Sequence, residues 1–274
     1  MTVTIFNRPD VQEFLNELSG LNNKDGDPRM KQIVHRLMSD LFKAIDDLNI
    51  TPDEYWQGVA WLNDLGAAGQ VGLVSPGLGI DHFMDERLDA IDAAMGIENP
   101  TPRTIEGPLY VAGAPESVGF ARLDDGNDTN GQTLIMQGKV HGADGQPLPG
   151  AKVEVWHCDT RGFYSHFDPT GQQAPFNMRR TIIADDQGCY KFQSILPSGY
   201  GVPPGSPTEG LLTALGRHGQ RPAHIHFFVS ADGHRKLTTQ INIEGDPLIH
   251  DDFAYATREG PVSYTHLTLP TKRI

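Results

Sequence analysis

A change in residue pattern near position 104 limits the possible folds more than anything else in the sequence. Before it, as in the stretch from Met30 to Leu48, apolar residues recur every three or four positions and so line one face of an amphipathic helix. After it, short β-rich segments alternate with turn-forming pairs such as Asp144-Gly145. The sequence therefore predicts an α+β protein, with a helical region over residues 1–104 and an antiparallel β-sandwich or barrel over residues 105–261.

Local signals locate the helices of the first region. Asp27-Pro28 combines a capping side chain with proline at the first helical position, and Thr51 with Glu54 forms a capping box. Another helix is predicted from about Ile80 to Met95. The glycine-rich stretch Gly72 to Gly79 is interpreted as a loop between helices.

The strands of the second region are short. Alternation of polar and apolar residues in Lys152 to Val155 is typical of a half-buried strand. The clearest predicted strands are Thr133–Met136, Ala151–Trp156, Thr181–Ala184 and Ile225–Val229.

Composition narrows the classes of partner and compartment. The 274 residues carry a formal charge of −13 and no long basic stretch for binding nucleic acid. The first fifteen residues do not read as a targeting peptide, and no apolar run approaches the length of a membrane span. The two cysteines, Cys158 and Cys189, indicate no disulfide framework, although one bridge between them is an alternative to two free thiols. We expect a cytoplasmic protein without a nucleic-acid partner or membrane insertion.

A pair of histidines is the sharpest local signal for chemistry. In a strand, alternate residues share a face, so His224 and His226 project together and can bind one metal ion through neutral imidazole nitrogens. A His-x-His pair is a weak signal alone, because zinc hydrolases and cupins also contain it. His157 beside Cys158 lacks the further ligands of a zinc site, and His166 is either close to the metal site or solvated.

Longer motifs surround this pair in a fixed order. Tyr164 lies in Asp159–Ser165 and Tyr200 in Leu196–Gly201; each alone reads as a half-buried aromatic residue. Together with Gly107–Tyr110, Gly150–His157 and Arg221–Phe227, these segments resemble the intradiol ring-cleavage dioxygenases, and within them the catechol 1,2-dioxygenase branch. The resemblance extends from the helical region to about Pro261.

The resemblance implies an iron site and an activity. It implies that Tyr164, Tyr200, His224 and His226 bind one non-haem iron(III) per subunit, a hard cation that suits two phenolates. It also implies cleavage of catechol by O2 to cis,cis-muconate, in the catabolism of aromatic compounds through the β-ketoadipate pathway. Tyr200 would leave the metal and accept a substrate proton, Arg221 would stabilise developing charge, and Gln240 would orient the intermediate.

The resemblance also implies a substrate pocket and an assembly. An apolar wall without a cation for a ring carboxylate favours catechol over protocatechuate, while hydroxyquinol and chlorocatechol remain alternatives. In the family the helical region forms a homodimer interface with a tunnel that can hold a lipid; packing against its own sandwich is the structural alternative. The residues implied for the pocket wall are Leu73, Pro76, Ile105, Pro108, Leu109, Phe253 and Ala254.

Two further interpretations concern the tail and a class of non-enzymes. Residues 262–274 depart from the family, and Val262 to Leu267 reads like a translated sequencing adapter, so we interpret this tail as non-native. The segment from Gly138 to Val155 also resembles the first strands of prealbumin-like sandwich modules, which bind ligands without catalysis. Such a module needs neither paired tyrosines nor the His-x-His pair.

Overall fold

The computed structural model describes residues 3–97, 100–129 and 131–258. The chain forms two compact units, Met1–Gly66 and Ala67–Ile274. The predicted non-native tail, 262–274, and the predicted end of the sandwich at residue 261 lie outside the described residues. The division of roles between residues 1–104 and 105–261 stays a prediction.

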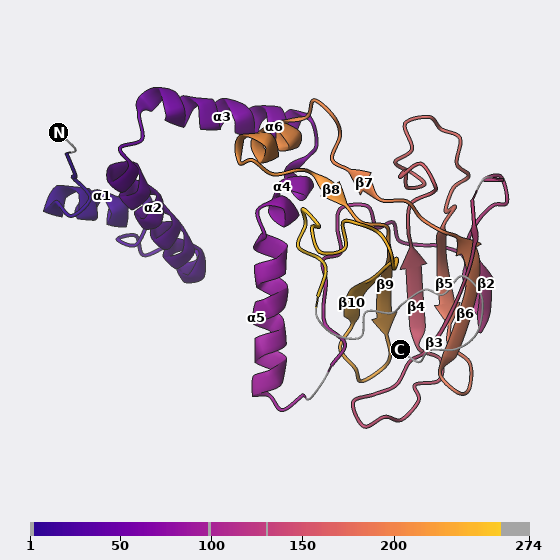
Figure 1. The fold of residues 1–274 in the computed structure, drawn as a ribbon. Coiled ribbons are helices and arrows are strands. Elements are labelled where there is room, and N and C mark those ends of the chain that lie inside the picture. The colour runs from indigo at the N-terminus through magenta and orange to yellow at the C-terminus, as the bar shows by residue number, and fades with distance from the viewer. Residues whose placement is uncertain (1–2, 98–99, 130, 259–274) are drawn as a thin grey trace. The chain divides into compact units, whose positions relative to one another are not determined.

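The first unit is helical, and its capping signals are confirmed. Its helices are α1 (Pro9–Leu18), α2 (Pro28–Leu48) and α3 (Pro52–Ala67), the last of which ends one residue beyond the unit (Figure 1). The Asp27 side chain accepts hydrogen bonds from the amides of Arg29 and Met30, at 2.7 and 3.2 Å. Thr51 and Glu54 form the reciprocal bonds of a capping box, because the Thr51 amide donates to Glu54 Oε2 and the Glu54 amide donates to Thr51 Oγ1.

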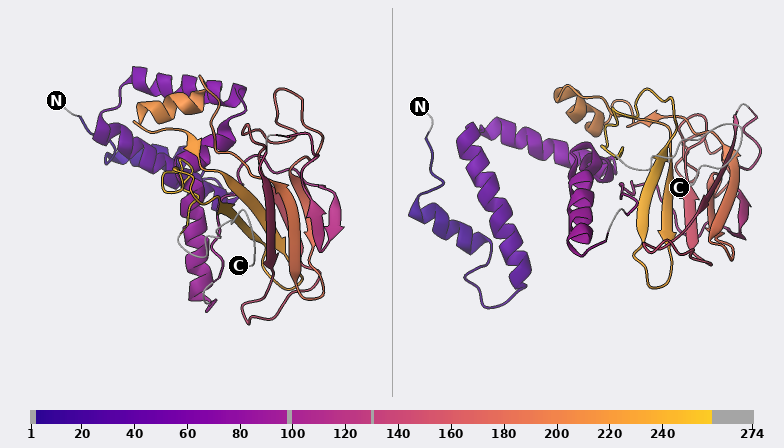
Figure 2. Two further views of the ribbon diagram at one scale, coloured as in Figure 1. Left: turned by 45° about the vertical axis from the view of Figure 1, so that its right-hand side comes forward. Right: turned by 60° about the horizontal axis from the view of Figure 1, so that its bottom comes forward.

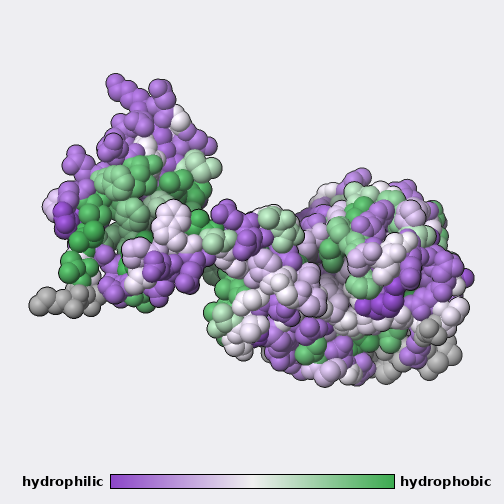
Figure 3. Space-filling view, turned by 90° about the horizontal axis from the view of Figure 1, so that it is seen from above, coloured by the Kyte–Doolittle hydropathy of each residue, from purple (hydrophilic) through white to green (hydrophobic). Residues whose placement is uncertain are grey.

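The apolar face of α2 is exposed within this structure. No residue of α2 is buried, and Leu37 and Leu48 are 62% and 73% exposed. Figure 3 shows apolar side chains gathered on one face of the helical unit. An exposed apolar stripe of this length is typical of a surface that binds a partner.

The described residues of the second unit include three helices: α4 (Val71–Gly77), α5 (Ile80–Ala94) and α6 (Pro207–Ala214). The helix predicted from Ile80 to Met95 is confirmed as α5, whereas the loop predicted from Gly72 to Gly79 is wrong, because α4 occupies most of it. Close packing explains the glycines of α4. A side chain on Gly72 would meet Pro108 at 3.3 Å, and one on Gly77 would meet the ring of Phe253 at 3.4 Å.

Two larger β-sheets lie in the described part of the second unit, and the predicted α+β class is confirmed. The larger sheet has the order β1-β5-β4-β9-β10 and the smaller has the order β2-β6-β3; β7 and β8 pair separately. Figure 2 shows the strands from two further sides. The strands are β1 (Glu116–Val118), β2 (Phe120–Arg122), β3 (Thr133–Lys139), β4 (Lys152–Trp156), β5 (Arg179–Ile183), β6 (Cys189–Ile195), β7 (Tyr200–Gly201), β8 (Gln220–Arg221), β9 (His224–Ser230) and β10 (Leu237–Asn242).

The two sheets enclose one hydrophobic core. Fully buried residues come from the smaller sheet, such as Leu134 and Phe192, and from the larger sheet, such as Val153 and Ile225. The main pairings are antiparallel, as predicted, but β1 pairs with β5 and β2 pairs with β6 in parallel. The sequence pattern does not foretell these two short strands, because three residues are too few to show alternation.

Ion pairs join α5 to other segments of the second unit. Asp89 and Asp92 of α5 both bind the guanidinium of Arg103, at 2.7 Å. Asp92 also binds Arg235, from the connection between β9 and β10, at 3.0 Å, and Asp89 binds Arg258 at 2.9 Å. None of the helices in the described part of the chain is both long and apolar enough to cross a membrane.

Candidate active site

The four residues predicted as metal ligands come together at one end of the larger sheet. His224 and His226 lie on the same face of β9, and His226 is opposite Trp156 of β4 and Gln240 of β10. Tyr200 is in β7, which pairs with β8 so that Tyr200 is opposite Arg221. Tyr164 is brought to the same place by the loop that follows β4. Sheet register and strand pairing thus gather residues from distant parts of the sequence.

The donor atoms of these residues are spaced as ligands of one ion would be. The two phenol oxygens are 3.4 Å apart, and each lies 3.4–3.5 Å from Nε2 of His224. Nε2 of His224 is 3.0 Å from Nε2 of His226. Bonds of about 2.0–2.2 Å to a central ion place neighbouring ligand atoms about 3.0–3.6 Å apart, so the four atoms fit a single metal ion.

Neighbouring groups orient both imidazoles. Nδ1 of His224 donates to the carbonyl of Pro222 at 2.6 Å, which leaves the lone pair on Nε2 free to bind a metal. The ring of His226 stacks on the ring of Trp156, with centroids 4.8 Å apart and planes 6° from parallel. These contacts fix the ring orientations in which His224 Nε2 lies beside both phenol oxygens and His226 Nε2 lies 3.0 Å from His224 Nε2.

Burial sets the ionisation of the four residues. Burial, and then the charge of Arg221, lowers the pKa of His224 to about 3. Burial also lowers the pKa of His226 well below its ordinary value, so both imidazoles are neutral near pH 7 and each could bind a metal through a nitrogen lone pair. Burial raises the pKa of Tyr164 and of Tyr200, although Arg221 partly opposes this at Tyr200. Two phenolates at this place therefore require a bound cation.

The donor set also restricts the kind of metal. Among the described residues, no group of three or more His, Cys, Asp and Glu side chains could hold a metal ion. This argues against a closed cysteine–histidine zinc site and against the two-histidine, one-carboxylate iron(II) site within that part of the chain. Two phenol oxygens and two imidazoles fit iron(III) instead.

Arg221 is a buried cation at the edge of this cluster. Its Nη1 lies 3.0 Å from His224 Nε2 and 3.4 Å from the Tyr200 hydroxyl. Its Nη2 donates to Gln240 Oε1 at 2.7 Å, and the guanidinium also binds Asp252. Burial opposes the charge, but the oxygens of Tyr200 and Asp252 outweigh it and keep the pKa of Arg221 above its ordinary value. The structure thus brings Arg221 and Gln240 to the predicted ligands.

Sequence reasoning missed Asp252 and Arg179. Asp252 follows no motif, and only the fold brings it to Arg221. Arg179 is 1% exposed and its guanidinium lies 5.7 Å from the centroid of the Tyr164 ring. Its Nε and Nη2 donate to the side chain and carbonyl of Ser165, so Arg179 supports the loop that carries Tyr164.

Only some of the predicted pocket-wall residues belong to one cluster of buried apolar residues. Ile105, Phe253 and Ala254 share a buried cluster with Val202 and Leu212. Within α4, Pro76 is buried and Leu73 is half-buried; Pro108 is exposed. Leu109 packs instead against a different buried cluster, formed by Trp156, Cys158, Tyr164 and Phe228. The predicted wall residues therefore come from α4, from the segment 105–109 and from residues 253–254, and their role as a pocket wall stays a prediction.

The other residues weighed as ligands lie elsewhere. His157 is fully buried and makes hydrogen bonds to the Cys158 carbonyl at 2.7 Å and to Ser194 Oγ at 2.8 Å. His166 accepts a hydrogen bond from the amide of Phe176 through Nε2. Both cysteines are free thiols.

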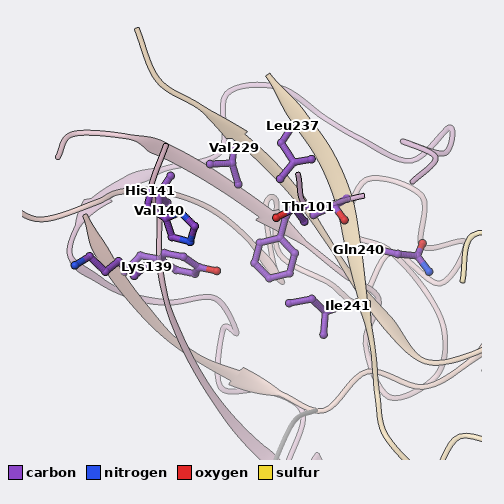
Figure 4. A pocket seen from close by; sticks show the side chains of 11 residues that line it. Thr101, Lys139, Val140, His141, Val229, Leu237, Gln240 and Ile241 are labelled. Carbon is purple, nitrogen blue, oxygen red and sulfur yellow. The ribbon is translucent and has the colours of Figure 1, made fainter. Parts of the chain in front are cut away.

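A cavity of about 120 Å³ lies between β3 and β10, apart from the four predicted ligands (Figure 4). It shares only Gln240 with the predicted site residues. In Figure 4 the Gln240 side chain points away from the other labelled side chains, in agreement with its hydrogen bond to Arg221. The remaining lining residues are Thr101, Lys139, Val140, His141, Tyr190, Phe227, Val229, Leu237, Thr239 and Ile241.

Sequence profiles of known families match both regions of the chain. The profile of the catechol dioxygenase N terminus matches residues 27–96, and the profile described as Dioxygenase matches residues 105–270. The chain belongs to the intradiol dioxygenase family.

Individual relatives agree with this membership. A catechol 1,2-dioxygenase of Acinetobacter baylyi is 69% identical over 96% of this chain and 84% of that protein. One from a Pseudomonas species is 58% identical over 94% of this chain and 85% of its own length. A hydroxyquinol 1,2-dioxygenase of a Rhizobium species and a chlorocatechol 1,2-dioxygenase of Rhodococcus opacus are 31% and 34% identical, over 85% and 82% of this chain and 78% and 83% of theirs.

The fold agrees as well. The structure of the catechol 1,2-dioxygenase from Acinetobacter sp. ADP1 inhibited by bound mercury superposes with a TM-score of 0.93, covering 96% of this chain and 85% of that chain. The intradiol dioxygenase expected from the sequence motifs is therefore confirmed at the level of family and fold.

Proposed function

We propose that this chain cleaves the ring of catechol between its two hydroxyl-bearing carbons, consuming O2 and releasing cis,cis-muconate. Both atoms of O2 enter the product, since muconic acid keeps every atom of catechol and gains the two oxygen atoms. The high identity to catechol 1,2-dioxygenases over most of the chain supports this activity, and the hydroxyquinol and chlorocatechol enzymes are distant relatives. We place the activity in the catabolism of aromatic compounds.

The observation that carries the proposal is the convergence of two phenol oxygens and His226 Nε2 on Nε2 of His224, each within 3.0–3.5 Å of that atom, with the two phenol oxygens 3.4 Å apart. The family uses non-haem iron. We propose that Tyr164, Tyr200, His224 and His226 hold one iron(III) per subunit. A bound iron(III) would supply a Lewis acid that binds catecholate and withdraws electron density from its ring.

The surrounding side chains have separable roles in this proposal. The Tyr200 oxygen is within reach of Arg221 Nη1 and accepts the proton of a substrate hydroxyl. The Arg221 guanidinium stabilises negative charge that develops on the substrate ring. Gln240, which accepts a hydrogen bond from Arg221, orients the reaction intermediate. The apolar side chains of Ile105, Phe253 and Ala254, with the other predicted wall residues, exclude water and select an uncharged ring.

Visible absorption tests the ligand set. Iron(III) bound by phenolate absorbs visible light, so iron-loaded protein should be wine-red and should convert catechol to muconate. Tyr164→Phe and Tyr200→Phe should each weaken the visible band. Tyr190→Phe is the matched control, because Tyr190 is buried in the sandwich core away from the four donor atoms. Iron-loaded protein without a visible band would contradict the proposed site.

A substrate panel tests the ring preference. Catechol, a chlorocatechol, hydroxyquinol and protocatechuate would be compared by kcat/KM. Catechol should give the highest value, because no cationic side chain is among the proposed wall residues to pair with a ring carboxylate. A higher value for hydroxyquinol or chlorocatechol would assign the enzyme to that branch of the family.

We also propose that the helical region, residues 1–104, forms a homodimer, while residues 105–261 carry catalysis. The exposed apolar face of α2, with Leu37, Leu41 and Leu48 at its surface, supports such an interface and a bound lipid chain. Leu37→Lys should shift the protein toward monomer in light scattering, whereas Gln32→Lys on the same helix should not. A lipid would be detected by mass spectrometry of an organic extract. The free thiols support a cytoplasmic location, which cell fractionation checks.

A further inference from the structure

The guanidinium of Arg221 is held on two sides. Its Nε and Nη2 donate to Oδ1 and Oδ2 of Asp252 at 3.1 and 3.0 Å. Nη2 also donates to Gln240. This leaves Nη1 directed at the Tyr200 hydroxyl and at His224 Nε2. The orientation of Arg221 is thus set from the side remote from the donor atoms.

Asp252 is buried, and both of its carboxylate oxygens accept hydrogen bonds. The side chains of Asp252 and Arg221 are 1% and 4% exposed. Asp252 Oδ1 also accepts a hydrogen bond from the amide of Ala254 at 3.0 Å, and the next residue, Phe253, donates its amide to the carbonyl of Gln220 at 3.1 Å. One carboxylate therefore joins the strand that carries Arg221 to the segment that supplies part of the predicted pocket wall.

This arrangement has a physical consequence for a reaction at the site. A free arginine side chain samples many rotamers, and a two-point ion pair removes this freedom before substrate arrives. A misplacement of about 1 Å in a catalytic group lowers a rate by about 100-fold. A buried guanidinium without its carboxylate would turn toward other acceptors, such as Gln240 or the hydroxyl of Tyr200.

We propose that Asp252 is a positioning residue for the reaction: its carboxylate fixes Arg221 so that Nη1 faces the bound substrate, and it locks the 253–254 wall to the same arginine. The inference rests on the proposed function, because it assigns Asp252 a role through Arg221. It goes beyond that function in naming the residue that orients the arginine. The hydrogen bonds of the Asp252 carboxylate go to Arg221 and to the amide of Ala254, so Asp252 would act on the reaction through the arginine.

The test measures kcat, KM and the visible spectrum of iron-loaded Asp252→Asn, which keeps the shape and removes the charge. We expect kcat to fall by about 10- to 100-fold, while the resting visible band and the iron content match those of the wild type. Asp252→Glu keeps the charge but shifts it by one methylene, and should also lower kcat. The control is Asp89→Asn, which breaks ion pairs of α5 remote from the site and should leave kcat and the band unchanged.

A double-mutant cycle separates positioning from general structural support. In an Arg221→Met background, Asp252→Asn should cause no further loss of kcat, because its effect passes through Arg221. An equal loss in both backgrounds, or a wild-type kcat in both Asp252→Asn and Asp252→Glu, would overturn the inference while leaving the proposed function intact. A different result would refute the proposed function: the wild-type protein itself would lack the visible band or would not cleave catechol.

Discussion

Acid should destabilise the sandwich through His157, a histidine that no step of catalysis uses. The imidazole is fully buried between the Cys158 carbonyl and Ser194, and burial lowers its pKa to about 4, against about 6.5 in an unfolded chain. Between these values the unfolded chain binds a proton that the folded protein does not. The stabilisation is therefore complete above pH 6.5 and is lost as the pH falls toward 4.

The size of the effect follows from the two pKa values. At 1.36 kcal/mol for each pKa unit, His157 accounts for about 3 kcal/mol of unfolding free energy between pH 6.5 and pH 4. The assay is urea unfolding of the metal-free chain at a series of pH values, followed by near-ultraviolet circular dichroism. His157→Gln, which does not titrate, should lose about 3 kcal/mol less than the wild type on acidification.

The matched control is His234→Gln, because His234 is exposed and its replacement should leave the pH dependence unchanged. Both proteins retain His224 and His226, so their contributions cancel in the comparison with the wild type. Equal pH slopes for the wild type and His157→Gln would contradict this account of acid sensitivity. So would a steeper slope for the variant.

Three further predictions concern stability and the metal. Asp85 has a buried Oδ2 without a hydrogen-bond partner. Burial, opposed by Arg258, raises the pKa of this carboxyl group to about 6. Because the folded protein binds the proton more tightly than the unfolded chain does, the stability falls as the pH rises from 4 to 6. Asp85→Asn should therefore raise the free energy of unfolding by about 1–2 kcal/mol at pH 8, allowing for partial exposure of the side chain, and by less at pH 5. An equal gain in stability at the two pH values would argue against this cause. Gly138→Ala should destabilise by about 1–3 kcal/mol in urea unfolding, because its methyl group would meet the Tyr190 ring and hydroxyl at 2.5–2.7 Å. Gly210→Ala is the control and should not destabilise, because Gly210 also lacks a positive φ and nothing lies within 4 Å of an added methyl group there. Removing iron with a strong chelator should abolish the visible band and lower the melting temperature, and added iron(III) should restore both; an unchanged melting curve would be inconsistent with a metal bound by the folded state.

Much of the local structure was predictable because short-range rules govern it. The cap at Asp27, the box of Thr51 with Glu54, and the helix from Ile80 each depend on residues within one turn. The stretch around Val71–Gly77 was misread as a loop because its glycines are explained by neighbours distant in sequence, Pro108 and Phe253. Propensity alone carries no information about such contacts.

In the candidate site, too, some residues were predictable from the sequence and others were found only in the structure. Alternation along a strand was enough to place His224 and His226 on one face, and family motifs supplied Tyr164, Tyr200, Arg221 and Gln240. Nothing local connects Asp252 with Arg221, or Arg179 with Tyr164. Those pairings exist because strand order and loop packing bring their backbones together.

The amino-acid sequence is sufficient for the α+β class, the family, and the set of side chains able to bind a hard metal ion. How those side chains are held depends on the folded structure: the stack of Trp156 on His226, the tautomer of His224, and the carboxylate that orients Arg221. Residue type and short-range spacing fix which atoms are available for chemistry. Their directions depend on burial and on partners that fold in from elsewhere in the chain, because a buried charge or donor is stable only where another part of the structure compensates it.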